Sequence, residues 1–346
     1  MRYPRSACGK LTRGLARAPR VGDSGAMSSG EVRDGVSLTN LDQPLSAGSD
    51  VTKRDLVDYL EAVADRMIAA LRDRPLSVVR ALRGQDPFMQ KNLPKYAPEW
   101  VERVSVWAES SHRRVSYALC NDRRTLLWFA NQRAVEYHPA LGLAGSLGHP
   151  THLVLDLDPP AGDESFALAV RAAFLVRQAL ADAGLRGAVK TSGSKGVHVF
   201  VPVRGADAEA AAAATRAIAA RAERIDPDLA TTAFIRDDRA GKVFLDSTRA
   251  GGATVVGVYS PRVRPGLPVS FPVPWDDLDR VSVAEFSLRS VPGLLGSADP
   301  WAASLPEPQE LPAELVEHGR TIPVARVQAM HEGKRRARAR RAAGGS

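Results

Sequence analysis

The sequence predicts a mixed α/β fold, because segments with the character of helices alternate with short apolar segments typical of strands. The chain has 346 residues, 44% of them hydrophobic, which is enough to bury a sizeable core. Two alanine-rich segments, 165–184 and 208–225, have the composition and length of helices, and the first ends at Gly184. The apolar run HLVLDLD at 152–158 precedes them and predicts a strand.

The remaining elements follow from the same local signals. Leu56, Leu60, Val63, Met67 and Leu71 recur at helical spacing and predict an amphipathic helix over 53–72. Short β-branched and aromatic runs predict strands elsewhere, and a segment rich in large apolar residues predicts a further helix. In chain order these are strands at 104–109 and 115–120, a helix at 124–137, a strand–turn–strand unit at 188–203, and a strand within 241–248.

Composition divides the chain into three parts. Residues 1–35 are rich in Gly, Ser, Arg and Pro and predict a disordered basic extension, 36–312 a globular domain, and 313–346 a basic C-terminal helix or tail. The formal net charge is +8, of which residues 1–33 carry +5 and residues 326–346 carry +6, leaving −3 for the rest. A nucleic-acid groove in the globular part would therefore be a local patch.

Cysteine content and hydropathy limit the location of the protein. Only two cysteines are present, so neither a disulfide framework nor a cysteine-based zinc site is expected. No apolar run approaches the roughly 20 residues needed to cross a bilayer. These features predict a cytoplasmic protein that does not contact a membrane.

Two aspartates close the apolar strand at 152–158. Alternate side chains of a strand share a face, so Asp156 and Asp158 are expected to project together. Two carboxylates at such a short distance repel each other unless a cation lies between them. Hard oxygen ligands suit Mg²⁺ or Mn²⁺. The pattern alone is equally compatible with a metal site and with a pair that caps the following helix.

A Gly/Ser turn and a third aspartate follow. SGSKGVH, 192–198, combines glycines that free the backbone with Lys195, which suits a triphosphate, although an ordinary hairpin tip would look similar. It lacks the P-loop pattern. Asp246 ends another apolar strand, and a lone aspartate there is more often a turn former. A third carboxylate would, however, complete a two-metal site of the kind used in phosphoryl transfer.

The ordered set of motifs resembles the archaeo-eukaryotic primase superfamily, and within it the polymerase domain of bacterial end-joining ligase D and the related stand-alone actinobacterial primase-polymerases. The resemblance extends over roughly residues 36–295. It is carried by FMQKNLPKYAPEW, RTLLWFANQRAVEYHP, LVLDLDPP, KTSGSKGVHVFVPV, GKVFLDSTR and YSPRVRPGLPVSFPVPWDDL. It implies the primase-polymerase α/β core, in which two sheet-based modules hold the active site between them.

The resemblance also implies residue roles. Asp156, Asp158 and Asp246 would be the catalytic residues and the ligands of two Mn²⁺ or Mg²⁺ ions. The nucleotide-binding residues would be His138, Ser192, Lys195, His198, Arg249 and Arg262. The expected substrates are NTPs or dNTPs, with ribonucleotides preferred, added at short gaps or broken DNA ends in double-strand-break repair by end joining.

The part that would hold DNA departs from the family pattern. Asn40 and Lys53 match residues that bind a DNA 5′-phosphate, Gln43 stands where a lysine is expected, and Arg80 is a candidate replacement for another basic residue. Phe88 is followed by Met89, where the family often has two aromatic residues that contact the template. Losing one stacking ring would cost about 1–3 kcal/mol.

Partners and alternatives complete the prediction. No ligase signature of the KxDG type is present. We therefore expect a nucleoid-associated protein that acts beside a separate ATP-dependent DNA ligase and a Ku-like end binder. Two other functions compete with the polymerase: a non-catalytic DNA-end binding module, and a phosphatase of the haloacid dehalogenase type. The phosphatase motif requires Gly and Thr after the aspartates, whereas Pro159 and Pro160 follow here.

Overall fold

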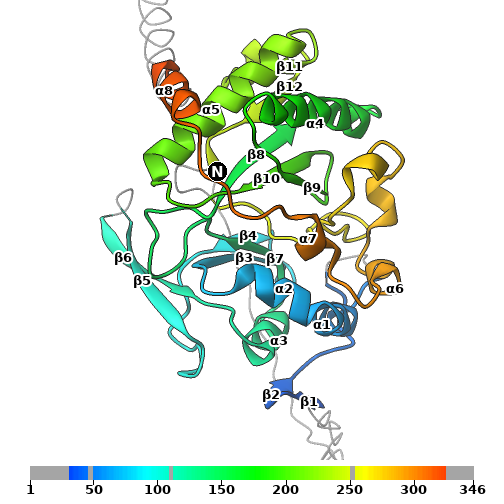
Figure 1. Cartoon of the computed structure of the whole chain (residues 1–346). Helices are drawn as coiled ribbons and strands as arrows, with labels where there is room; N and C mark the ends of the chain where they lie inside the picture. Colours follow the sequence, from blue (N-terminus) through cyan, green and yellow to red (C-terminus); the bar gives the residue numbers. More distant parts are fainter. Residues whose placement is uncertain (1–30, 46–49, 109–111, 250–253, 325–346) are drawn as a thin grey trace, which may run out of the picture.

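A computed structural model describes residues 31–45, 50–108, 112–249 and 254–324 (Figure 1). Most of the predicted N-terminal extension, 1–30, and of the predicted C-terminal tail, 325–346, lies outside these ranges. Residues 31–35 of the predicted extension instead belong to a hairpin of β1 (Glu31–Arg33) and β2 (Val36–Leu38). None of the helices in the described ranges is long and apolar enough to cross a lipid bilayer.

The first module is a sheet of five strands with helices against it. Its order is β4-β3-β6-β5, with β7 paired to the other edge of β3. The strands are β3 (Leu76–Arg80), β4 (Phe88–Gln90), β5 (Arg103–Ala108), β6 (Arg113–Ala118) and β7 (Ala134–Pro139), and the helices are α1 (Lys53–Ala62), α2 (Ala64–Leu71) and α3 (Arg123–Asn131). The helix predicted over 53–72 is present as α1 and α2, which meet at Val63.

The helix predicted over 124–137 is only half correct. Asp122 caps the start of α3, because its side chain accepts a hydrogen bond from the Thr125 N–H. The helix ends at Asn131, and Arg133 adopts a left-handed conformation with φ 60°. The chain then turns into β7, which pairs antiparallel with β3 and is buried along its whole length. Burial on both faces removes the alternation that would have marked a strand.

The second module is a sheet in the order β11-β12-β8-β10-β9. Its strands are β8 (His152–Asp158), β9 (Ala188–Thr191), β10 (Val197–Pro202), β11 (Ala230–Thr231) and β12 (Val243–Asp246). Helices α4 (Ser165–Ala181) and α5 (Ala208–Ile225) contact each other and β8, and α8 (Ala313–Thr321) packs on α5. The predicted strand 152–158 and helix 208–225 have the predicted bounds.

The segment 254–273 ties the modules together. Gly257 N–H donates to the Tyr137 carbonyl of β7, and Tyr137 N–H donates to the Ser260 hydroxyl. Further along the segment, the Phe271 carbonyl accepts a hydrogen bond from Thr191 N–H of β9. The segment continues into the short helices α6 (Val291–Leu294) and α7 (Pro300–Ser304). Figure 1 shows the two modules one above the other with this segment beside them.

Candidate active site

The predicted carboxylates meet on the face of the second sheet opposite the helices. Antiparallel pairing places Asp156 of β8 directly opposite His198 of β10 on one side and Asp246 of β12 on the other. Paired residues point to the same face, so these three side chains form a row across the sheet. Asp158 lies two residues along β8 and shares their face. The alternating leucines of β8 point to the opposite face.

A guanidinium occupies the centre of the carboxylate cluster. Arg249 Nη2 lies 2.8 Å from Asp156 Oδ2 and 3.1 Å from Asp246 Oδ2. Asp246 Oδ1 accepts hydrogen bonds from the N–H and the hydroxyl of Thr248. Asp156 Oδ1 lies 3.2 Å from His198 Nε2. In the described ranges the carboxylate of Asp158 has neither a hydrogen bond nor an ion pair.

The electrostatics of the cluster differ between its two β8 aspartates. Burial alone would raise the pKa of Asp156, but His198 and Arg249 outweigh it and hold that pKa below its usual range. For Asp158, the attraction of Arg249 and Arg239 is the weaker influence on the pKa. Burial, followed by the neighbouring carboxylates of Asp156 and Asp246, raises the pKa of Asp158 to about 6. The site therefore holds more negative charge than Arg249 alone relieves.

The chemistry of the donors fits a divalent cation. Carboxylate oxygens are the ligands that Mg²⁺ and Mn²⁺ prefer, and the unpaired Asp158 beside two further carboxylates is the kind of repulsion that a cation removes. Among the described residues, however, no group of three or more His, Cys, Asp or Glu side chains is arranged to hold a metal ion. Arg249 bridges two of the three aspartates.

The Gly/Ser turn is closed by its own serine. Ser192 Oγ accepts hydrogen bonds from the N–H groups of Ser194 and Gly196. Lys195 Nζ crosses to the loop after β8 and donates to the Pro159 carbonyl, 2.6 Å away. Ser192 therefore closes the turn on itself, and Lys195 ties the turn to the loop that follows the aspartates.

The two glycines of the turn are required by close packing. A Cβ on Gly193, which has φ +66°, would lie 2.7 Å from Arg262 Cγ, and one on Gly196 would lie 2.5 Å from the Leu157 carbonyl oxygen. Only a hydrogen at these positions lets the turn approach β8 and Arg262 so closely.

The first module contributes a second set of polar groups. Glu136 and His138 lie two residues apart on β7 and share one face of the strand. His138 Nε2 lies 2.9 Å from Glu136 Oε2. The same carboxylate lies 3.2 Å from Arg262 Nε, and its other oxygen accepts from Val263 N–H. Arg262 Nη1 in turn donates to the Ser192 carbonyl at 2.7 Å. Glu136 thus joins His138 and Arg262 to the turn of the other module.

Two buried residues were missed by the sequence analysis, Glu136 and Lys190. Burial would raise the pKa of Glu136, but His138, Arg262 and the Val263 N–H outweigh it and lower that pKa to about 2. Lys190 of β9 lies opposite His198 and is completely buried. Had 134–139 been identified as a strand, the placement of Glu136 and His138 two residues apart would have signalled a shared face. Lys190 carried no comparable signal.

The predicted DNA-binding residues are on the first module and do not join this cluster. Lys53 Nζ is buried and donates to the Thr39 carbonyl and to Asn131 Oδ1, while Asn40 is exposed with φ 53°. Burial, and then Arg133, lower the pKa of Lys53 to about 8.

Arg80 and the nearby Phe88 lie close to the turn between α3 and β7. Arg80 donates to the Gln132 carbonyl, to Gln90 and to the Tyr96 hydroxyl, and its guanidinium lies 5.9 Å from the Phe88 ring centroid. Phe88 and Met89 are exposed on β4 at 38% and 44% of their surface, so both can be reached by a partner. The turn between α3 and β7 thus connects Lys53 to Arg80.

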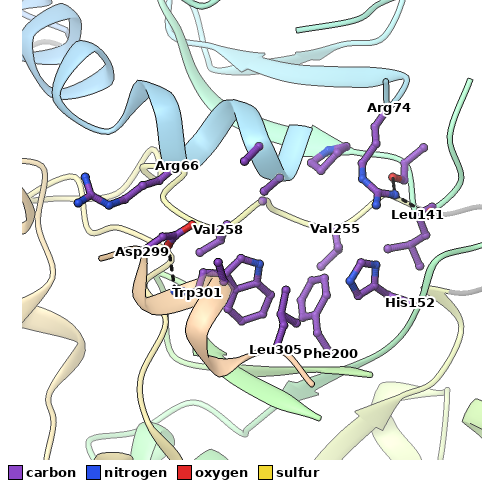
Figure 2. Close-up of a pocket in the computed structure, with 16 residues that line it drawn as sticks. Arg66, Arg74, Leu141, His152, Phe200, Val255, Val258, Asp299, Trp301 and Leu305 are labelled. Atoms are coloured by element: carbon purple, nitrogen blue, oxygen red, sulfur yellow. Dashed lines mark hydrogen bonds between the residues drawn. The ribbon is translucent and has the colours of Figure 1, made fainter. Parts of the chain in front are cut away.

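A separate cavity of 210 Å³ lies between the modules (Figure 2). Phe200, Trp301, Leu305, Val255 and Val258 give it apolar walls, and Arg66 and Arg74 lie at its two ends. Arg74 is already bonded to the Leu141 carbonyl and the Thr151 hydroxyl. None of the three aspartates lines this cavity, so it is distinct from the carboxylate cluster.

Comparison with known proteins identifies the class. A family model described as the LigD primase-polymerase domain matches residues 52–301. The polymerase domain of Mycobacterium tuberculosis ligase D, solved in complex with DNA, superimposes with a TM-score of 0.70 at 32% identity, covering 78% of this chain and 99% of that one. The chain is a nucleotidyltransferase of the primase-polymerase class, and the predicted fold is confirmed. It belongs to the LigD primase-polymerase domain family.

Full-length relatives give the same result. The multifunctional non-homologous end joining DNA repair protein LigD of Mycobacterium tuberculosis is 35% identical over 271 residues, covering 74% of this chain and 35% of that protein. The bifunctional non-homologous end joining protein LigD of Bacillus subtilis is 31% identical over 262 residues, covering 74% of this chain and 42% of that protein. The chain therefore corresponds to less than half the length of these relatives.

Proposed function

We propose that this protein is a template-directed polymerase that adds nucleotides to primer ends at short gaps or double-strand breaks in DNA. The observation that carries the proposal is the row of Asp156, His198 and Asp246 across three strands, with Arg262 bonded to the neighbouring turn and His138 linked to Arg262 through Glu136. Carboxylates beside a basic turn suit a reaction between a primer hydroxyl and a triphosphate.

In this reaction the primer 3′-oxygen attacks the α-phosphate of the nucleotide, and pyrophosphate leaves. Asp156, Asp158 and Asp246 would hold two Mn²⁺ or Mg²⁺ ions, which when bound favour the ionised hydroxyl and offset phosphate charge. Lys195, Arg262 and His138 would contact the triphosphate. The N–H groups of Ser194 and Gly196 already donate to Ser192 Oγ, which holds the backbone of the turn in place before the nucleotide binds.

His198 and Arg249 complete the proposed nucleotide site. His198 is nearly fully buried beside Asp156, so any contact it makes with the nucleotide excludes water. Arg249 is 29% exposed and can turn from the carboxylates toward the triphosphate. Ribonucleotide preference is part of the proposal, by analogy with the family.

The proposed DNA contacts lie on the first module. Asn40, Lys53 and Arg80 would bind a downstream 5′-phosphate, and Phe88 and Met89 would contact the template. Lys53 and Arg80 are bonded to neighbouring protein groups, so a phosphate must compete with those bonds. Names of the relatives refer to end joining, which supports DNA ends as the substrate and a separate ligase and a Ku-like end binder as partners at the nucleoid.

Single-nucleotide incorporation on a one-nucleotide-gapped duplex tests the proposal. It is run with Mn²⁺ or Mg²⁺, with rNTP or dNTP, and with or without the downstream 5′-phosphate. We expect the double variant Asp156→Ala/Asp158→Ala to lose incorporation and keep DNA binding. Asp163→Ala/Glu164→Ala is the matched control, because it removes the same number of charges from two exposed positions just beyond β8.

The outcomes separate the candidate functions. Templated extension that is lost only in the first variant supports the polymerase. DNA binding without incorporation under every condition favours the non-catalytic end-binding module instead. Family membership removes the support for the phosphatase alternative.

A further inference from the structure

Lys190 is a buried basic residue to which the proposed chemistry gives no task. It lies on β9 opposite His198, which itself lies opposite Asp156 on β8. Lys190 therefore extends the row of Asp246, Asp156 and His198 to a fourth strand. Lys190 is fully buried, and no carboxylate of the described residues lies within ion-pair distance of its Nζ. A buried lysine without a counter-ion requires hydrogen-bond partners.

The partners of Lys190 have fixed directions. Ser270 donates its hydroxyl hydrogen to the Thr191 carbonyl at 2.8 Å, so its oxygen is free to accept. Lys190 Nζ lies 2.5 Å from that oxygen and must be the donor. Its other polar neighbour is His198 Nδ1, at 2.9 Å. The Phe200 ring, whose centroid is 5.3 Å from Nζ, covers another side of the amine.

The opposite side of the imidazole determines where its hydrogen lies. His198 Nε2 is 3.2 Å from Asp156 Oδ1, and an ionised carboxylate can only accept. The hydrogen therefore belongs on Nε2. On the other side of the ring, Nδ1 faces Lys190 Nζ, and a hydrogen on Nδ1 would point at the hydrogens of that amine. Nδ1 is left as an acceptor, which Lys190 satisfies.

We propose that Lys190 is a positioning residue that fixes His198 as its Nε2–H tautomer by donating a hydrogen bond to Nδ1. His198 then presents a hydrogen-bond donor beside Asp156 and is not available there as a base. The use of this donor in nucleotide binding rests on the proposed polymerase function, whereas the tautomer itself does not.

Nitrogen NMR of the full chain with ¹⁵N-labelled histidine tests the tautomer directly. His198→Gln identifies the His198 signals among those of the seven histidines. We expect a single Nε2–H form in the parent protein, and a second tautomer or a protonated ring in Lys190→Met. Lys190→Gln retains N–H donors and should keep more of the Nε2–H form. Phe200→Leu is the matched control, because it disturbs the same buried contact without removing the donor.

An Nδ1–H ring in the parent overturns the proposal, and this spectrum decides it even where a variant does not fold. So does a Lys190→Met spectrum that matches Phe200→Leu. Nucleotide affinity gives a second readout. Lys190→Met and His198→Gln should each weaken binding about tenfold, and the double variant hardly further, because the two residues act as one unit. Additive losses of nucleotide affinity would mean that Lys190 supports the fold without positioning His198. Equal nucleotide affinity in all variants would count against the polymerase proposal and leave the tautomer result standing.

Discussion

Replacing Arg249 with glutamine should make the metal-free protein less stable and its affinity for divalent ions higher. The guanidinium is the cation that the structure places between Asp156 and Asp246. A divalent ion that binds these carboxylates has to displace it. Removing it leaves three converging carboxylates with less compensation, so the same substitution acts in opposite directions on folding and on metal binding.

The size of the effect follows from the contacts. At an effective dielectric constant of about 20, unit charges about 4 Å apart attract by about 4 kcal/mol. Arg249 is 29% exposed, and solvent screening with the desolvation of the guanidinium reduces this to about 1–3 kcal/mol. If all of that coupling opposes the metal, Mn²⁺ affinity should rise by about 5–150-fold.

Calorimetric titration with MnCl₂ and thermal unfolding in EDTA measure both effects. Arg280→Gln is the control, because Arg280 also pairs with an aspartate but is 74% exposed. Polymerase activity is not the deciding measurement, since Arg249 is also a proposed nucleotide contact. Unchanged Mn²⁺ affinity together with unchanged stability would refute the argument that Arg249 acts as an internal counter-ion.

Three further outcomes are expected. Asp158→Asn should stabilise the metal-free protein at pH 7 by about 1–3 kcal/mol in thermal unfolding, since the folded pKa of about 6 lies above the ordinary value of 3.8 and the charged form therefore costs stability above pH 6; a lower melting temperature would contradict this. The stimulation of gap filling by a 5′-phosphate should decline from pH 7 to pH 9, because Lys53, with a pKa lowered to about 8, loses its charge in this window; a pH-independent ratio to the unphosphorylated gap would exclude Lys53. Met89→Phe should tighten DNA binding in fluorescence anisotropy by up to about 1–3 kcal/mol through base stacking, and an unchanged affinity would place the template elsewhere.

Local pattern was sufficient for most of the second module and for only part of the first. The strand ending in Asp158 and the alanine-rich helix α5 have their predicted bounds, because each has a strong pattern of its own. The run 134–139 was predicted as helix and is β7, because pairing with β3 and the left-handed Arg133 decide its conformation. Such long-range pairing leaves no trace in a short window of sequence.

The candidate site shows the same division. The three aspartates were found from their positions at strand ends and from the family resemblance. Glu136 and Lys190 were not, because a charged residue inside an apolar strand gains its meaning only from what lies opposite on neighbouring strands. The glycines of the turn were predicted for their flexibility, whereas Gly193 is needed because Arg262 and Ser270 leave no room for a Cβ.

The cross-strand row also bears on how the protein avoids inactive folded forms. A slip of β8 by one residue would turn Asp156 and Asp158 toward α4 and α5 and bring Leu155 and Leu157 to the polar face. Two carboxylates in an apolar layer would cost far more than the correct register, so misaligned molecules would unfold instead of accumulating. The same alternation that builds the carboxylate cluster thereby also disfavours folded molecules in which the aspartates are misplaced.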